Sequence, residues 1–268
     1  MNKVILVLSD ALRYDVARPN MGFMGHLVET KQASLYKIIG ELPSMSRPMY
    51  ETIHTGVPSS EHGIVANSIV RRSIMPNIFQ CAAEAGKVTA AAAYYWFSEL
   101  YNRVPFDRID DKELDDEKLS IQHGRFYTED EYPDVEVFTS AALLVRRFSP
   151  DYLLIHPMGM DYHGETYGSD SSEYRNQAIK QDAILAPLIL EWKARGYTIF
   201  ITGDHGINAD GAHGGTTPEQ REVPLFLIRP DGQGSGDTSE TVSHLQIAPT
   251  VLKLLDVPIP ESMKMSPL

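Results

Sequence analysis

The sequence predicts an α/β protein with a mostly parallel central sheet and helices on both faces, arranged as three α/β/α layers. Short apolar runs bounded by turn residues have the length and composition of strands buried on both faces. Segments with helical spacing of apolar residues lie between them, and this alternation is typical of parallel strands joined by crossover helices. The 268 residues are 43% hydrophobic and 22% charged, an ordinary globular composition. We therefore expect one domain over residues 1–268.

The expected elements follow in chain order. The first apolar run, residues 4–8, is too short for the apolar core of a signal peptide and is expected to be a buried strand. Further strands are expected at 88–94, 152–155, 197–202 and 223–228. Helices are expected at 76–85, 135–147, 172–193 and 246–255, with another that ends at Gly56. In the longest helix the apolar residues recur near helical spacing, namely Ile179, Leu185, Leu188, Ile189 and Trp192.

Charge and cysteine content exclude several classes of protein. The 24 Lys+Arg against 36 Asp+Glu give a net charge of −12, which repels polyanions, so no nucleic-acid polymer is expected as a partner. A single Cys81 excludes a disulfide framework and a Cys-rich zinc site. No apolar run is long enough to suggest a membrane partner, and a cytoplasmic location is expected. The acidic stretch within about 104–132 is expected to be a surface insertion or a small cap.

Carboxylates and imidazoles follow three of the expected strands. Because the carboxyl ends of parallel strands meet at one edge of a sheet, these side chains are expected to lie close together. Taken singly, Asp10 fits a helix cap, Asp204 a turn and His213 a loop. Together they favour a site for divalent metal ions, for which Asp and His are the usual ligands. The residues concerned are Asp10, Asp161, His163, Glu165, Asp204, His205 and His213.

A nucleophile is expected at Ser46, within a Pro-rich segment that begins the helix ending at Gly56. The same position suits an ordinary helix N-cap, and spacing alone leaves both interpretations open. At a helix N-terminus a hydroxyl lies in positive partial charge beside free N–H groups that can bind phosphate. Arg47 is either a charged donor to that phosphate or a surface residue. Met49, three residues after Ser46, has a side chain without a hydrogen-bond donor, so it cannot hold a phosphoryl oxygen.

In order and combination, these motifs resemble the alkaline phosphatase superfamily, most closely its type I phosphodiesterase/nucleotide pyrophosphatase branch. The resemblance spans almost the whole chain and implies an alkaline-phosphatase-like fold. The matching stretches are Leu8-Ser9-Asp10, the segment 43–48, Thr55-Gly56, His62-Gly63-Ile64-Val65-Ala66-Asn67, the segment 161–168, Asp204-His205-Gly206, His213-Gly214 and Ala248-Pro249-Thr250-Val251.

The resemblance implies two divalent metal ions, zinc or manganese, with magnesium as a further candidate. It assigns one ion to Asp10, Asp204 and His205, with the Ser46 hydroxyl as nucleophile. It assigns the other ion to Asp161, His213 and a third ligand. In the frame of the family motif that third ligand is Glu165, where the family has His, and His163 is the alternative. A carboxylate there shifts the preference toward Mn²⁺ or Mg²⁺.

The implied function is metal-dependent hydrolysis of a small-molecule phosphodiester or pyrophosphate through a Ser46 phosphoryl-enzyme. A phosphomonoesterase is the main alternative, and a phosphomutase or a non-catalytic metal or phosphate sensor are further ones. Outside this set, His62 is expected to hydrogen-bond within its turn and His156 to support a ligand. The basic pair Arg71 and Arg72 is expected at the surface. Three tyrosines are expected to pack in the core or at its rim, namely Tyr14, Tyr162 and Tyr167.

Overall fold

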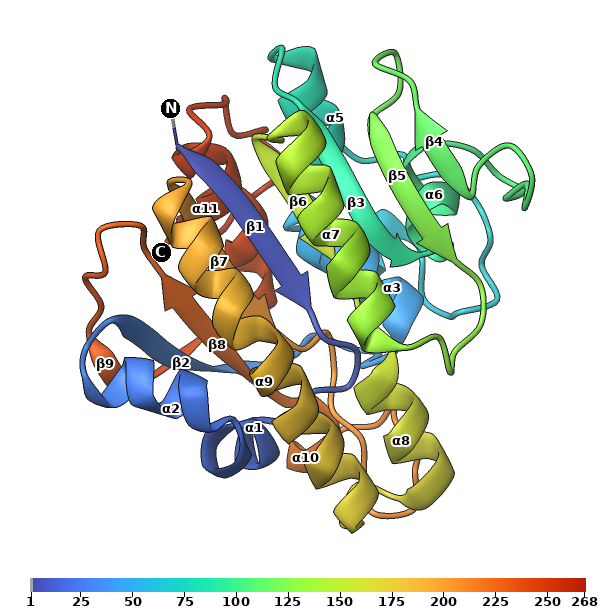
Figure 1. The fold of residues 1–268 in the computed structure, drawn as a ribbon. Helices are drawn as coiled ribbons and strands as arrows, with labels where there is room; N and C mark the ends of the chain where they lie inside the picture. The colour runs from blue at the N-terminus through green and yellow to red at the C-terminus, as the bar shows by residue number, and fades with distance from the viewer. Residues whose placement is uncertain (1) are drawn as a thin grey trace.

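The computed structural model describes residues 2–268, and its centre is a nine-stranded sheet (Figure 1). The strand order across the sheet is β4-β5-β3-β6-β1-β7-β8-β2-β9. The strands are β1 (Lys3–Leu8), β2 (Ala33–Ile39), β3 (Thr89–Tyr94), β4 (Glu113–Asp115), β5 (His123–Tyr127), β6 (Tyr152–Ile155), β7 (Tyr197–Thr202), β8 (Glu222–Ile228) and β9 (Gly236–Val242).

The sheet is mostly parallel, which confirms the predicted fold class. β1 lies between β6 and β7 and is parallel to both, and β3 continues the parallel array from β6 to β5. β8 runs antiparallel to its neighbours β7 and β2, and β4 runs antiparallel to β5. The acidic segment 104–132 thus supplies the two strands at one edge of the sheet, β4 and β5. Its role as a cap stays a prediction.

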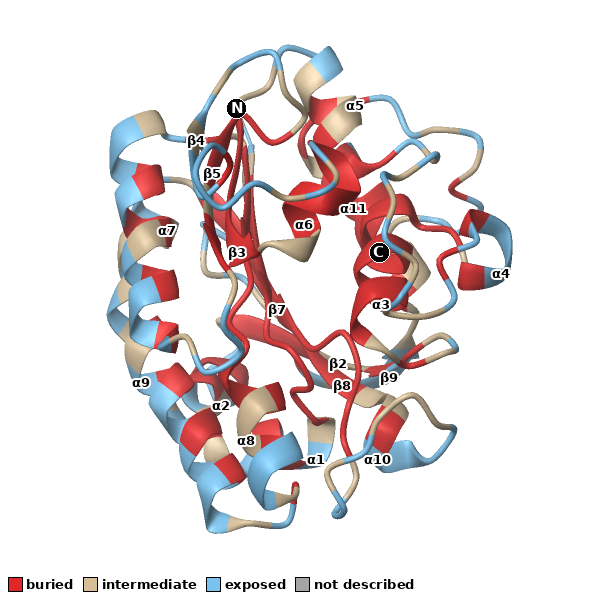
Figure 2. Ribbon diagram, turned by 90° about the vertical axis from the view of Figure 1, so that its right-hand side faces the viewer, coloured by how far each residue is buried: buried red, intermediate tan, exposed pale blue. Residues whose placement is uncertain are grey.

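Helices lie on both faces of the sheet. Figure 2 shows α7 and α9 on one side and α3, α6 and α11 on the other, with the buried strands between them. The α-helices are α1 (Tyr14–Asn20), α2 (Gly22–Glu29), α3 (Ser46–Thr55), α4 (Ser59–His62), α5 (Ile78–Glu84), α6 (Trp96–Tyr101), α7 (Asp134–Phe148), α8 (Gly159–Tyr167), α9 (Ser172–Ala194), α10 (Pro218–Arg221) and α11 (Ile247–Leu254), the last preceded by a short 3₁₀ helix, His244–Gln246.

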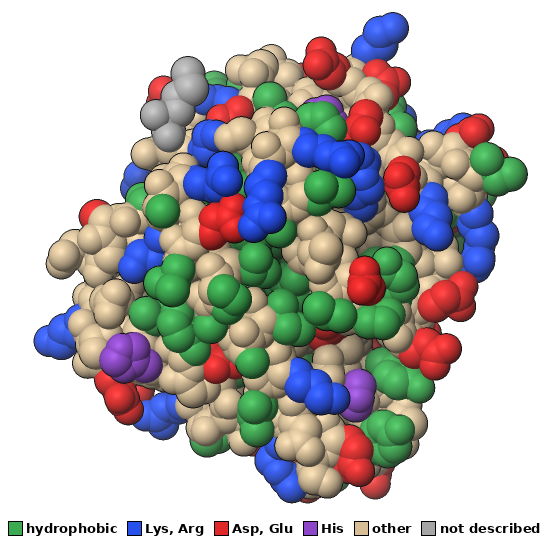
Figure 3. Space-filling view, viewed as in Figure 1, with side chains coloured by type: hydrophobic (Ala, Val, Ile, Leu, Met, Phe, Trp, Pro, Cys, Tyr) green, Lys and Arg blue, Asp and Glu red, His purple; other side chains and the backbone are tan. Residues whose placement is uncertain are grey.

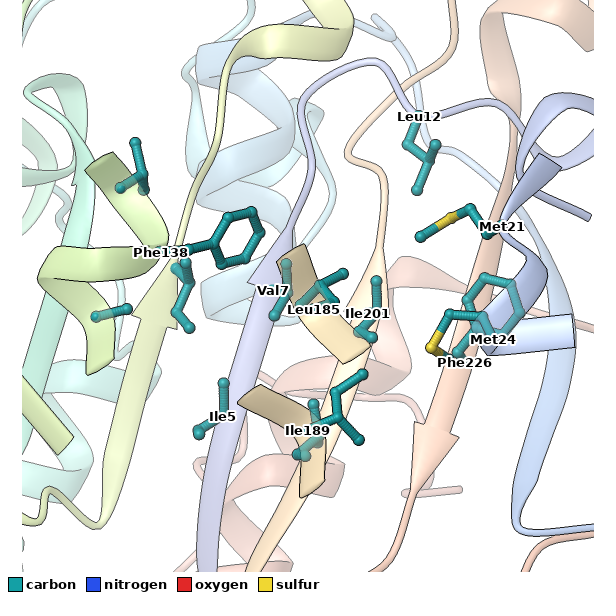
Figure 4. Packing of buried hydrophobic residues seen from close by; sticks show 14 of the residues in the cluster. Ile5, Val7, Leu12, Met21, Met24, Phe138, Leu185, Ile189, Ile201 and Phe226 are labelled. Carbon is teal, nitrogen blue, oxygen red and sulfur yellow. The ribbon is translucent and has the colours of Figure 1, made fainter. Parts of the chain in front are cut away.

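Each face of the sheet has its own hydrophobic core, because successive strand residues point to opposite faces. On β1, Ile5 and Val7 pack under α7 and α9, together with Leu185 and Ile189 of α9 (Figure 4). Val4, Leu6 and Leu8 point to the other face and pack with residues of α3, α5, α6 and α11. The central strands are therefore buried on both sides, as their continuous apolar sequences predict.

The outer face of α7 and α9 is partly apolar. Figure 3 looks onto this face and shows hydrophobic side chains among charged ones. Among the apolar residues with helical spacing on α9, Ile179 is 47% exposed, whereas Leu185, Ile189 and Trp192 are fully buried. No helix among residues 2–268 combines the length and the apolarity needed to cross a membrane.

Candidate metal centre

The first cluster of candidate ligands comprises Asp10, Asp204 and His205, at the ends of the adjacent strands β1 and β7. All three side chains are fully buried. His205 Nε2 lies 3.3 Å from Asp10 Oδ1 and 3.4 Å from Asp204 Oδ2. The His205 Nδ1–H donates to Gly206 O at 3.0 Å, which leaves the Nε2 lone pair facing both carboxylates. Asp10 does not cap a helix, because α1 begins only at Tyr14, after Arg13.

The Asp10 carboxylate is held by two donors on its other oxygen. His156 Nε2 donates to Asp10 Oδ2 at 3.2 Å, and the Tyr50 hydroxyl donates to the same oxygen. Burial opposes ionisation of Asp10, but these hydrogen bonds and the nearby imidazoles lower its pKa to about 2. Asp10 Oδ1 is left without a hydrogen-bond partner and points at the cluster. His156 therefore supports a candidate ligand, as predicted, and Tyr50 is a supporting residue that the sequence did not reveal.

The second cluster lies directly beside the first. Asp161 and His213 group with His205 at metal-ligand spacing, and the His205 and His213 rings stack at 4.4 Å between centroids. Glu165 Oε1 lies 3.2 Å from His213 Nε2. The structure thus brings Asp161, His205 and His213 within ligand spacing of one another and places Glu165 beside His213, and the role of Glu165 as the third ligand stays a prediction.

Residues 159–167 form the helix α8, which is not among the helices expected from the sequence. On a helix, residues four apart share a face, so Asp161 and Glu165 both project toward His213. Gly164 allows this helix to approach the segment after β7, because a Cβ at this position would lie 2.9 Å from Ile207 Cγ2. His163 lies two residues after Asp161 and points elsewhere, with its Nδ1–H donating to Gly159 O at 2.7 Å.

The donor atoms suit divalent cations. Three buried carboxylate oxygens at the two clusters have no hydrogen-bond partner among the described residues: Asp10 Oδ1, Asp161 Oδ1 and Asp204 Oδ2. Burial and repulsion from neighbouring carboxylates raise the pKa of Asp161 and Asp204 well above the usual range. When a tetrahedral ion has bonds of about 2.1 Å, two of its ligand atoms lie about 3.4 Å apart. The imidazole nitrogens of His205 and His213 lie at similar distances from the neighbouring carboxylate oxygens, 3.2–3.4 Å. A cation would relieve both the repulsion and the missing hydrogen bonds.

Ser46 is the first residue of α3, and the N-cap position is occupied by Met45. The Ser46 Oγ lies 3.1 Å from His205 Nε2, at the first cluster. The alternative reading of Ser46 as an ordinary helix cap is therefore not supported by the geometry. At its other end the helix closes at Gly56, whose φ of +61° suits a residue without Cβ.

Arg47 is buried, so its predicted alternative as a surface residue is wrong. Its side chain is 1% exposed, and Nη2 donates to Glu99 Oε2 at 2.8 Å. The guanidinium carbon lies 4.3 Å from the centroid of the Trp96 ring. These partners tie the start of α3 to α6, and the predicted contact of Arg47 with phosphate stays a prediction.

Asn67 is a candidate functional residue that the sequence analysis missed. Its Oδ1 accepts the Arg47 backbone N–H at 3.0 Å, which places the side-chain amide beside Ser46. The loop that carries Asn67 is fixed at both ends, since His62 Nδ1 accepts the Ile64 N–H at 3.1 Å and Ser73 donates to buried Glu51 at 2.5 Å. Asn67 ends the matching stretch 62–67, but the sequence does not reveal its contact with α3, which joins residues 20 positions apart.

The remaining candidates play structural parts in the described contacts. His62 bonds to Thr52 Oγ1 at 2.9 Å and to Ile64 in its turn, as predicted. Arg71 donates to His62 O at 2.6 Å and to Arg72 O at 3.0 Å. Lys37 lies over the Tyr14 ring at 4.9 Å, and Tyr167 is exposed at the surface.

Comparison with known proteins gives the same family as the motifs. Residues 4–211 match the family model of type I phosphodiesterase/nucleotide pyrophosphatase. The catalytic subunit of human GPI ethanolamine phosphate transferase 3 is 22% identical over 97% of this chain, and GPI ethanolamine phosphate transferase 2 of Candida albicans is 23% identical over 97%. This chain covers only 25% and 31% of those two proteins. A 2,3-bisphosphoglycerate-independent phosphoglycerate mutase of Haloquadratum walsbyi is 31% identical over 62% of this chain and 34% of its own length.

Solved structures share the fold. Murine ectonucleotide pyrophosphatase/phosphodiesterase 5 superposes with a TM-score of 0.69 at 14% identity, over 96% of both chains. The phosphonate monoester hydrolase of Silicibacter pomeroyi gives a TM-score of 0.69 at 15% identity, over 100% of this chain and 76% of that one. The chain belongs to the type I phosphodiesterase/nucleotide pyrophosphatase family.

Proposed function

We propose that this protein hydrolyses the phosphodiester or pyrophosphate bond of a small-molecule substrate, with Ser46 as nucleophile between two divalent metal sites. The observation that carries the proposal is the position of the Ser46 hydroxyl. It lies 3.1 Å from His205 Nε2, inside a cluster in which Asp10 Oδ1 and Asp204 Oδ2 have no hydrogen-bond partner among the described residues. The murine family member with the same fold has been solved, as an inactive variant, in complex with AMP, which supports a small phosphate ester as substrate.

In the proposed reaction Ser46 Oγ forms a bond to phosphorus while the bond to the leaving oxygen breaks. Water then displaces Ser46 and releases the phosphoryl product. Asn67 Oδ1 accepts the Arg47 N–H, and the NH₂ of the same amide would donate to a phosphoryl oxygen. The N-terminus of α3 adds positive partial charge at the same place.

Divalent cations, when bound, would supply Lewis acidity that lowers the pKa of the Ser46 hydroxyl and neutralises the phosphoryl oxygens. Asp10, Asp204 and His205 would hold one cation, and Asp161, Glu165 and His213 the other. Tyr50 and His156 keep the Asp10 carboxylate oriented, since both donate to Oδ2 and leave Oδ1 directed at the cluster.

A phosphoryl transferase is the second candidate. The relatives named GPI ethanolamine phosphate transferases match over almost all of this chain, which favours transfer to an alcohol. The first half-reaction is the same in both cases, and only the acceptor differs, water or a hydroxyl group. Phosphomonoesterase and phosphomutase activities remain alternatives, and both would use the same Ser46 chemistry.

The test compares bis-p-nitrophenyl phosphate with p-nitrophenyl phosphate, using protein loaded with Mn²⁺ or Zn²⁺. The proposal expects faster release of p-nitrophenol from the bis-ester. Adding a primary alcohol then separates the two acceptors, because a transferase forms the alkyl phosphoryl product at the expense of the hydrolysed one. A higher rate with the monoester would instead favour the phosphomonoesterase.

Ser46→Ala tests the nucleophile. We expect turnover to fall by roughly a thousandfold or more, because no other group replaces the hydroxyl. Ser59→Ala is the matched control, since this buried serine of α4 donates to Leu42 O and is not among the candidate ligands. Retained turnover in a folded Ser46→Ala protein would reject the mechanism. If the wild type turned over neither ester in the presence of metal, the result would favour a non-catalytic metal or phosphate sensor.

A further inference from the structure

We propose that the two metal sites have matching donor sets, so that both take Mn²⁺ in preference to Zn²⁺, and that the ion beside Glu165 is the exchangeable one. This inference rests on the proposed two-metal function and adds the identity and lability of the ions. It depends on how the ligands divide between the two sites, on their exposure, and on the direction in which His163 points.

The division of ligands follows from His205. Its Nε2 lies 3.3 Å and 3.4 Å from the two carboxylates of the first cluster, so it completes that site with Asp10 and Asp204. With His205 assigned to the first site, Asp161 and His213 need another donor, and Glu165 is the candidate because its Oε1 lies 3.2 Å from His213 Nε2. Each site consequently offers two carboxylates and one imidazole. Sites rich in carboxylate oxygen suit Mn²⁺ and Mg²⁺ better than sites rich in nitrogen.

Solvent exposure is what distinguishes the two sites. Asp10, Asp204 and His205 are fully buried. The Glu165 side chain is 51% exposed and that of His213 is 13% exposed. An ion bound by an exposed carboxylate can exchange with solvent after the release of one flexible ligand, whereas the first ion is surrounded by fixed side chains. We therefore expect one ion to be retained and the other to be lost on dilution.

His163 does not complete the second site in this arrangement. Asp161 and Glu165 are four residues apart on α8 and share a face, while His163 is offset by two residues and lies on another face. Its Nδ1–H is used by Gly159 O at 2.7 Å. Its neighbours include the Tyr162 and Tyr167 rings, at 5.5 Å and 5.9 Å between centroids.

The experiment measures metal binding without substrate. Protein freed of metal with a chelator is titrated with Mn²⁺ and with Zn²⁺ by calorimetry, and the Mn²⁺-loaded form is examined by electron paramagnetic resonance. We expect two equivalents of Mn²⁺, a spin-coupled signal, and about one equivalent left after gel filtration. Glu165→Gln should weaken only the weaker step, by at least about tenfold. Glu165→His should raise the affinity of that step for Zn²⁺ relative to Mn²⁺ by at least about tenfold.

His163→Gln is the matched control on the same helix and should leave both steps within about twofold of the wild type. A weakened second step in His163→Gln, or unchanged binding in Glu165→Gln, would overturn the inference, as would equal retention of both ions or a preference of the wild type for Zn²⁺. Melting temperatures of the metal-free variants check folding, and Glu165→Ala replaces any variant that fails. Normal two-step binding without ester cleavage would count against the proposed function and leave this inference standing.

Discussion

The pair of Arg47 and Glu99 offers a quantitative test, because it is a charge pair almost withdrawn from water. The two side chains are 1% and 7% exposed, and one hydrogen bond of 2.8 Å joins them. Arg47 Nε and Nη1 have no hydrogen-bond partner among residues 2–268. Breaking a buried pair by removing one charge typically costs about 3–5 kcal/mol, because the other charge stays buried without its partner. That is a large share of a domain's total stability of about 5–15 kcal/mol.

We therefore expect Glu99→Gln to lower the free energy of unfolding by about 3 kcal/mol or more, and Arg47→Met to lower it similarly. The double variant should lose less than the sum of the two, since it leaves no charge unpaired. Urea unfolding followed by circular dichroism gives all four values. Trp96, 4.3 Å from the guanidinium, reports the local change by fluorescence.

A cost below about 1 kcal/mol for Glu99→Gln would refute this reasoning, because it would place the pair among weak surface ion pairs. The same variants test the predicted phosphate contact of Arg47. If Arg47 only anchors α3 to α6, the double variant should turn over substrate at close to the wild-type rate. A stable double variant without activity would show that the guanidinium acts on the substrate.

Three further predictions follow from the described contacts. Chelation should abolish turnover and lower the melting temperature, because Asp10, Asp161 and Asp204 are then left buried together without a cation; an unchanged melting temperature in calorimetry would argue against the centre. Tyr50→Phe removes one of the two donors to Asp10 Oδ2 and should weaken Mn²⁺ binding by about 10–100-fold by calorimetry, with Tyr36→Phe, on β2, as the control. His54 is buried with its pKa lowered from 6.5 to about 3, chiefly by burial, so its contribution to stability is complete above pH 6.5 and is lost as the pH falls toward 3. Urea unfolding at several pH values between these limits gives the free energy of unfolding as a function of pH. The slope of this free energy against pH should be smaller in His54→Gln by about 1.4 kcal/mol per pH unit, and an unchanged slope would contradict the lowered pKa.

The central strands could be predicted from sequence because they are buried on both faces and therefore continuously apolar. β1, β3, β6 and β7 lie within a residue of their expected bounds. β9 was not predicted, because Gly236–Val242 is an edge strand of polar residues that needs no apolar pattern. β2 was also missed, and its antiparallel pairing with β8 is set by tertiary packing.

The candidate site was predictable in its residues more than in its geometry. Asp10, Asp161, Asp204 and His205 follow strands, so the edge rule for parallel sheets brings them together. The helical state of residues 159–167 was missed, because Gly159, Gly164 and Gly168 suggest a loop. Because these residues form a helix, Glu165 and His163 lie on different faces, a distinction that the spacing of residues in a loop does not give. The burial of Arg47 and the contact of Asn67 depend on α6 and on the loop after α4, both distant in sequence.

The order of the strands has a consequence for how the centre is assembled. β1 lies between β6 and β7, and the candidate ligands follow these three strands, which are distant in the chain. Parallel pairing of distant segments is slow, and it must be completed before the carboxylates meet. Metal uptake by the refolding chain should thus mark the end of folding and not its nucleation. The protein would then acquire its ions as a folded apoprotein, so the selectivity of the finished site and the local supply of metal would decide which ions it carries.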